Sequence, residues 1–327
     1  MKAKHYFLLF IVALVVVYLS GPTPETPNYS ATVIRNLDAE KLLNTTNLDP
    51  EGVKKGNETI LRFVGQATPY SILYIHGFSA SPEEGNPVHF KLHEHFGYNL
   101  VAPRLYAHGI ETDNPLLEFR ADSAWNSAVR GLEKALAIGD SVIIVSTSTG
   151  GALATQLALV DPRVAALVYY SPNVMPNDGA AFLLNNPWGE QIARVVLNSN
   201  FRDLEITDPY YEQYWYRYYR VESLPEMQEL VETGFADEAV ESLDIPVMVV
   251  CWYENEEKQD DAVSVPHMRS FYDKLEVPHK EFIELAANSH VIANGRYSSV
   301  IREVTDTTIH FLTMNGFMPV AKDTTAP

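Results

Sequence analysis

The sequence is poor in cysteine and in basic residues, and both shortages narrow what the protein can be. Its single cysteine, Cys251, cannot form an internal disulfide and lies in an apolar run, as a small buried side chain would. Lysine and arginine number 24 against 42 aspartate and glutamate residues, which gives a formal net charge of −18. Binding of nucleic acid or of an anionic membrane needs clustered positive charge, so neither is expected as the main task.

Internal repeats and low-complexity tracts are also missing, which excludes solenoid and fibrous architectures. Hydrophobic residues make up 46% of the 327 residues, an ordinary share for a globular protein. The chain is therefore long enough for one large α/β domain with an inserted subdomain, or for two ordinary domains.

One long apolar run is present, from Tyr6 to Leu19, and it follows Lys2, Lys4 and His5 without an acidic residue. A positive flank before an apolar run is typical of an export signal. The run is short for a bilayer span of about 20 residues, yet no small-residue cleavage site follows it. We interpret residues 1–21 as an uncleaved signal anchor, with a removed signal peptide as the alternative. Either way the remainder is predicted outside the cytoplasm, membrane-anchored or else periplasmic or secreted.

The rest of the chain divides by its hydrophobic pattern. Residues 22–56 form a proline-rich linker and a polar leader, and residues 321–327 form a tail. Strand-like runs alternate with helical patterns over 57–171 and again over 245–320, which predicts a mostly parallel sheet with helices on both faces. Residues 172–244, here called the insertion, interrupt this alternation with short helices and loops.

A serine lies at a sharp strand-to-helix junction. The β-branched run 142–145 leads into Ser146-Thr147-Ser148-Thr149-Gly150-Gly151, and an alanine-rich helical pattern follows. Such a turn presents its central serine, Ser148, as a nucleophile when the residues two before and two after it are small. Ser146 replaces the glycine of the usual G-x-S-x-G. The alternative is ordinary turn and N-cap chemistry.

An acyl-transfer serine needs a histidine base and a carboxylate that orients it. His290 is the only histidine in the loop after the strand-like run 280–285. The loop after the run 245–253 offers five acidic residues, from which we choose Asp260, with Asp261 as the alternative. Each follows the C-terminal end of a predicted parallel strand, where ligands bind in open α/β sheets.

The reaction also needs two backbone N–H donors for the developing oxyanion. Thr149, the residue after the nucleophile, supplies the first. The turn His76-Gly77-Phe78-Ser79 follows another strand-like run, and Phe78 is expected to supply the second, with Ser79 as the alternative. Read alone, His76-Gly77 would be an ordinary strand-ending turn.

Three segments within residues 72–157 together resemble the α/β-hydrolase superfamily, in its carboxylesterase and monoacylglycerol-lipase-like branch. They are "HGF" after a strand, "PRLYAHG" and "VSTSTGG". The resemblance implies an ester-cleaving serine hydrolase with no metal or organic cofactor. Besides Ser146, the departure is Tyr106-Ala107 in place of the commoner Pro-Gly before His108. A serine peptidase or amidase and a non-catalytic hydrolase-fold binding protein are the alternatives.

In that superfamily a lid is commonly inserted between the sixth and seventh strands, where we expect the insertion to lie. Its segment 209–220 is predicted as a helix with tyrosines 210, 214 and 218 on one face and Tyr211, Trp215 and Tyr219 on the next. Core packing is the alternative for these rings. We expect Tyr211, Trp215 and Trp188 to bind an apolar acyl or aryl group of a small ester.

Two groups of metal-ligand residue types also occur. His89, His93 and His95 have partial zinc-ligand spacing, but no third ligand of matching geometry is evident. The acidic loop from Glu254 lacks the spacing of an EF-hand. No metal site is expected.

Overall fold

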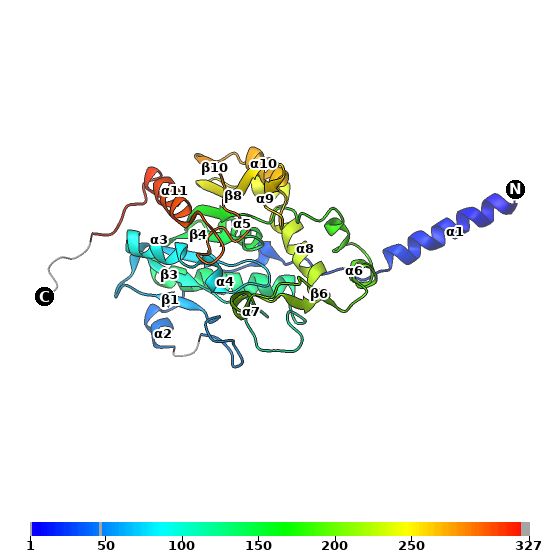
Figure 1. The fold of residues 1–327 in the computed structure, drawn as a ribbon, viewed down its shortest axis with the longest axis horizontal. Helices are drawn as coiled ribbons and strands as arrows, with labels where there is room; N and C mark the ends of the chain where they lie inside the picture. Colours follow the sequence, from blue (N-terminus) through cyan, green and yellow to red (C-terminus); the bar gives the residue numbers. More distant parts are fainter. Residues whose placement is uncertain (1, 46–47, 322–327) are drawn as a thin grey trace.

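A computed structural model describes residues 2–45 and 48–321. Its centre is an eight-stranded sheet (Figure 1) in the order β1-β3-β2-β4-β5-β8-β10, with β9 paired to β8. The strands are β1 (Ile60–Arg62), β2 (Thr68–Ile75), β3 (Asn99–Ala102), β4 (Gly139–Thr147), β5 (Val164–Tyr170), β8 (Val247–Asn255), β9 (Lys258–Gln259) and β10 (Lys280–Leu285). Only the β1–β3 and β8–β9 pairs are antiparallel. The mostly parallel sheet that the sequence predicts is confirmed.

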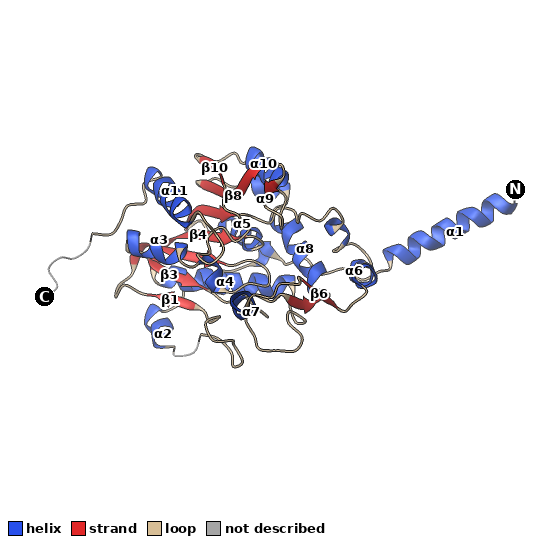
Figure 2. Cartoon of the chain, viewed as in Figure 1, coloured by secondary structure: helices blue, strands red, loops and turns tan. Residues whose placement is uncertain are grey.

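Helices cover both faces of this sheet (Figure 2). One face packs against α3 (Val88–Phe96) and α11 (Ile301–Met314), and the other against α4 (Ala121–Ala137), α5 (Gly150–Val160) and α10 (Val265–Lys274). Strand β2 illustrates this packing on both faces. Its Ile72 and Tyr74 belong to the core on the side of α3 and α11, and its Leu73 and Ile75 belong to the core on the side of α4, α5 and α10. Successive side chains of a strand point to opposite faces, so a strand buried on both sides is apolar throughout.

The ends of the helices follow local chemistry. Helix α3 ends at Gly97, whose positive φ of 66° lets its N–H bond the carbonyl of His93. Helix α4 ends two residues before Gly139, because Gly139 already pairs with Thr68 as the start of β4.

The insertion holds seven short elements between β5 and β8. They are η3 (Ala181–Leu183), α6 (Gly189–Leu197), β6 (Phe201–Asp203), α7 (Pro209–Tyr214), β7 (Tyr218–Arg220), α8 (Ser223–Gly234) and α9 (Asp237–Glu241). Among the described residues, the insertion follows the fifth strand of the main sheet in chain order and precedes the sixth. The prediction numbered these two strands sixth and seventh as in the superfamily; here they are fifth and sixth, because only the short β1 precedes β2.

The predicted aromatic helix 209–220 is also wrong beyond Tyr214. Helix α7 ends there, Trp215 has extended backbone, and Tyr218–Arg220 forms β7, antiparallel to β6. Aromatic residues favour strands when a partner strand is present, and Phe201 stacks on Tyr218 at 4.2 Å between ring centroids.

The N-terminal part has two different surroundings. Helix α1 (Lys2–Leu19) extends away from the rest of the molecule (Figure 1), and its apolar side chains from Tyr6 to Leu19 are largely exposed. No helix in the described part of the chain has the length and apolarity that crossing a membrane requires.

The leader after α1 packs on the core rather than forming a free linker. It contains η1 (Tyr29–Ala31) and α2 (Ala39–Asn44). The indole N–H of Trp125 on α4 donates to Thr32 Oγ1 at 2.9 Å, and the guanidinium of Arg35 pairs with the buried Glu133 at 2.8 Å. The polar leader therefore packs against the core from about Tyr29 onward.

Candidate active site

Ser148 stands at a sharp turn between β4 and α5. Its φ of 54° is the left-handed conformation that non-glycine residues rarely adopt, and its N–H bonds the carbonyl of Tyr170 at 3.0 Å. A Cβ on Gly150 would lie 2.4 Å from the carbonyl oxygen of Ile75, so the position two residues after Ser148 has no room for a side chain. Ser146 sits buried within β4, in register with Ile75 and Tyr169, so a serine is accommodated at the first glycine of the motif.

Asp260 and His290 meet beyond the ends of β8 and β10. The Nδ1 of His290 lies 2.8 Å from Oδ2 and 3.0 Å from Oδ1 of Asp260. The Asp260 carboxylate is buried, and its Oδ1 also accepts the N–H groups of Ala262 and Val263 at 3.1 Å each. Asp261 is exposed. Of the two candidate acids, the structure places Asp260 against the histidine.

Carboxylates control the protonation of His290. Burial acts to lower the pKa of His290, but the adjacent Asp260 and the nearby charges of Glu84 and Asp261 outweigh it, so the pKa lies above its ordinary value of 6.5. In the neutral ring, Nδ1 carries the proton that the carboxylate accepts, which leaves Nε2 as the basic atom.

Ser148 and His290 have a common neighbourhood, although the structure contains no hydrogen bond between them. A Cβ on Gly77 would lie 2.9 Å from Cβ of Ser148 and 3.3 Å from Oε1 of Glu84. Glu84 is in turn close enough to His290 for each charge to shift the pKa of the other. The loops that follow β2, β4 and β10 therefore meet at one place.

Two backbone N–H groups beside Ser148 are free to bind an anion. No acceptor within the described ranges takes the N–H of Phe78 or Thr149. The N–H of Ser79 is occupied, because it donates to Nε2 of His108 at 3.1 Å. This pattern favours Phe78 over Ser79 as the partner of Thr149 in an oxyanion hole.

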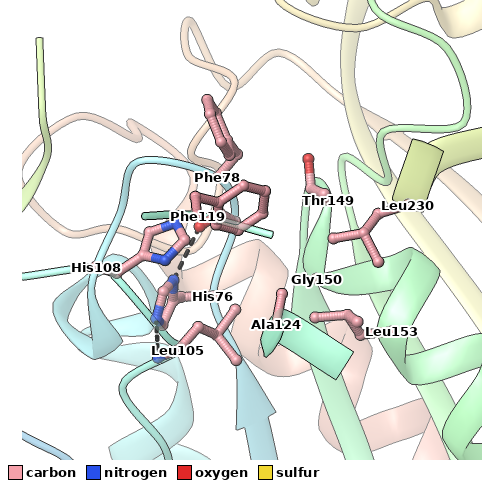
Figure 3. Close-up of a pocket in the computed structure, with 11 residues that line it drawn as sticks. His76, Phe78, Leu105, His108, Phe119, Ala124, Thr149, Gly150, Leu153 and Leu230 are labelled. Carbon is pink, nitrogen blue, oxygen red and sulfur yellow. Dashed lines mark hydrogen bonds between the residues drawn. The ribbon is translucent and has the colours of Figure 1, made fainter. Parts of the chain in front are cut away.

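Two buried histidines support this oxyanion loop, residues 76–79 (Figure 3). His76 Nε2 accepts the N–H of Leu105 at 3.0 Å, so its Nδ1–H donates to the carbonyl of Gly77 at 2.8 Å. Burial lowers the pKa of His76 well below its usual value and lowers that of His108 to about 4, so both rings stay neutral. The sequence contains both histidines in its "HGF" and "PRLYAHG" segments, but their bracing of the loop was not predicted.

The predicted substrate-binding aromatics are divided between two places. Tyr211 and Trp215 stack at 5.3 Å between centroids, and the Trp215 indole N–H reaches Oε1 of Glu84 at 3.4 Å. Trp188 is elsewhere, because its indole N–H donates to the carbonyls of Val17 and Tyr18 at the end of α1. The Trp188 ring is held against the N-terminal segment, and its role in substrate binding stays a prediction.

A small apolar cavity adjoins Thr149 and the oxyanion loop. Its volume is about 10 Å³, about enough for the centre of one water molecule. Figure 3 shows side chains from several elements around it. The lining residues are His76, Gly77, Phe78, Leu105, His108, Phe119, Ala124, Thr149, Gly150, Leu153 and Leu230.

The histidines with partial zinc-ligand spacing serve the packing of α3. His89 is buried, with Nε2 3.2 Å from the carbonyl of Pro82, and His93 Nδ1 lies 2.5 Å from the carbonyl of Tyr98. In residues 2–45 and 48–321, no three His, Cys, Asp or Glu side chains form a group that could hold a metal ion.

A mostly parallel sheet with a strained serine after one strand, and an Asp–His pair after two others, defines the α/β-hydrolase fold. The chain belongs to the alpha/beta hydrolase family, whose model matches residues 72–297. This confirms the superfamily resemblance. No curated protein is significantly similar to this chain in sequence.

Solved structures with this fold include several lipolytic enzymes. A structure from a study of LipS and LipT, two metagenome-derived lipolytic enzymes, has a TM-score of 0.62 and 17% identity, covering 80% of this chain and 99% of its own. The monoacylglycerol lipase of Paleococcus ferrophilus has a TM-score of 0.58 and 12% identity, covering 79% and 100%. A soluble variant of the Saccharomyces cerevisiae monoglyceride lipase has a TM-score of 0.55 and 14% identity, covering 79% and 92%. At these identities the similarity establishes the fold.

Proposed function

We propose that this protein hydrolyses carboxylic esters through an acyl-enzyme on Ser148. The observation that carries the proposal is the hydrogen bond of His290 to the buried Asp260, at the sheet edge where Ser148 is held at positive φ. Two unoccupied N–H groups beside the serine, and lipolytic enzymes among the structural neighbours, support the same chemistry.

In the proposed mechanism, Oγ of Ser148 attacks the ester carbonyl carbon while Nε2 of His290 takes the hydroxyl proton. Asp260 holds the Nδ1–H of His290 and stabilises the imidazolium that forms. The N–H groups of Phe78 and Thr149 bind the developing oxyanion. His290 then protonates the departing alkoxide, which leaves as the alcohol. A water, deprotonated by His290, cleaves the acyl-enzyme to the carboxylic acid and free Ser148.

The acyl group in this proposal is short and apolar. The cavity beside Thr149 is lined mainly by aliphatic and aromatic side chains, and its volume of about 10 Å³ is small. An acetyl or similarly short group therefore needs less rearrangement of Phe119 and Leu230 than a long chain does. Esters of p-nitrophenol with two to eight acyl carbons test this directly, with turnover expected to fall as the chain lengthens.

Cleavage of an amide would use the same residues, and it is distinguished by rate. Amine leaving groups need more complete protonation than alcohols, so parallel measurements on a matched ester and anilide separate the two activities. Export, predicted from the N-terminal segment, is a separate proposal that fractionation of the natural host tests.

The decisive experiment labels the protein with a fluorophosphonate and identifies the modified residue by mass spectrometry. We expect the label on Ser148, and we expect Ser148→Ala to lose several orders of magnitude in ester turnover while it stays folded. Ser146→Gly, which restores the usual motif two residues away, is the control and should still be labelled. A label on another residue, or turnover retained by Ser148→Ala, would remove Ser148 from the role.

A further inference from the structure

A second buried carboxylate lies beside the proposed active site, and the mechanism above does not use it. Glu84 belongs to the short helix η2 (Pro82–Gly85), and only 2% of it is exposed. Burying a carboxylate is costly unless hydrogen-bond donors surround it. The donors that surround Glu84 come from three different parts of the site.

The first donor is the oxyanion loop. The N–H of Gly77 reaches Oε2 of Glu84 at 2.6 Å, a short distance typical of a charge-assisted bond. On the other side of the same residue, the carbonyl of Gly77 accepts Nδ1–H of His76. That carbonyl and the N–H of Phe78 belong to one planar trans peptide, so they point in opposite directions. Glu84 and His76 together therefore fix the direction of the Phe78 N–H.

The second donor is Tyr74 on β2, which also contacts the serine turn, and the third is Trp215 in the insertion. The hydroxyl of Tyr74 lies 3.4 Å from Oε2 of Glu84 and 2.9 Å from Oγ1 of Thr147, the residue before Ser148. The indole N–H of Trp215 lies 3.4 Å from Oε1. One carboxylate thus joins the oxyanion loop, the serine turn and the insertion.

We propose that Glu84 is a positioning residue, which holds the Phe78 N–H in line with Ser148 and couples that alignment to the position of Trp215 in the insertion. The inference rests on the proposed hydrolytic function. Glu84 itself does not touch the reacting atoms; it acts through Gly77.

The charge of Glu84 has a second effect that a purely structural contact would lack. His290 faces three carboxylates, namely Asp260 and Asp261 on one loop and Glu84 on η2, and all three raise its pKa. Burial raises the pKa of the Glu84 carboxyl above its ordinary value of 4.5, and the N–H of Gly77, the charge of His290, Trp215 and Tyr74 offset this only in part. Removing the negative charge of Glu84 should therefore lower the pKa of His290.

The test is Glu84→Gln, which keeps the shape and removes the charge and one acceptor oxygen. Because the oxyanion N–H is misaligned rather than deleted, we expect kcat to fall roughly 10-fold with KM changed less than about threefold. The acid limb of the kcat/KM profile should move to lower pH, because one of the charges that raise the pKa of His290 is removed. Glu83→Gln is the matched control, since Glu83 bonds Asn86 and Tyr210 instead, and both measurements should stay at the wild-type values.

Tyr74→Phe keeps the Glu84 side chain but removes the hydroxyl that contacts both Glu84 Oε2 and Thr147 Oγ1, so it serves if Glu84→Gln does not fold. It should lower kcat a few-fold and leave the acid limb in place. An unchanged kcat in folded Glu84→Gln would overturn the positioning role. If Glu84→Gln does not fold, an unchanged kcat in Tyr74→Phe would overturn it instead. A loss in Glu84→Gln without a shift of the acid limb would do the same. These results would leave the proposed function intact as long as the wild-type protein hydrolyses esters and is labelled at Ser148. A wild-type protein that shows neither ester hydrolysis nor labelling would refute the proposed function itself.

Discussion

The substitution Asp260→Asn has consequences that can be worked out atom by atom. Oδ1 of Asp260 accepts the N–H groups of Ala262 and Val263 at 3.1 Å, so an asparagine must keep its oxygen at that position. Its NH₂ group then replaces Oδ2, which lies 2.8 Å from Nδ1 of His290. An amide NH₂ donates and does not accept, so the shorter contact now favours an imidazole with its proton on Nε2, and only Oδ1, 3.0 Å from Nδ1, still favours the proton on Nδ1. The tautomer with its proton on Nε2 cannot take the proton from Ser148.

The expected result is a loss of roughly 10³- to 10⁴-fold in kcat/KM, equivalent to about 4–5.5 kcal/mol of activation free energy. The assay is hydrolysis of p-nitrophenyl acetate from pH 5 to 9, with a thermal melt to show that the variant is folded. Asp261→Asn is the matched control, and because Asp261 is exposed its rate should stay within about twofold of wild type. A kcat/KM of Asp260→Asn within tenfold of wild type, or a larger loss of kcat/KM in Asp261→Asn, would refute the assignment of Asp260 as the acid that orients His290.

Two further predictions concern protonation and packing. Because nearby carboxylates raise the pKa of His290 and the neutral ring is the base, activity should be present at high pH and lost as pH falls through a midpoint above 6.5. A kcat/KM profile with its acid midpoint below 6.5 would contradict this. Gly150→Ala would place a Cβ 2.4 Å from the carbonyl oxygen of Ile75, so it should destabilise the protein by about 1–3 kcal/mol in thermal denaturation and lower turnover. In Gly179→Ala the new Cβ would have no atom within 4 Å, so this variant should melt at the wild-type temperature. Equal melting temperatures of the two variants would show that the turn at Gly150 rearranges to accept a Cβ.

Local sequence chemistry was enough to predict the sheet. Strand-like runs that alternate with helical patterns indicated a mostly parallel sheet, because these signals depend on neighbouring residues along the chain. The aromatic segment 209–220 was predicted less well. Its second half became β7 because a partner strand, β6, lies beside it, and strand pairing across the insertion leaves no local pattern.

The sequence by itself determined the order of Ser148, Asp260 and His290 and the place of each after a strand, since the C-terminal ends of parallel strands meet at one edge. Only the tertiary structure paired His290 with Asp260 and left the adjacent Asp261 exposed. It also buried Glu84, while its neighbour Glu83 took different partners. Adjacent acidic residues look alike in a sequence; which of them faces the interior depends on backbone direction and on donors that come from distant segments.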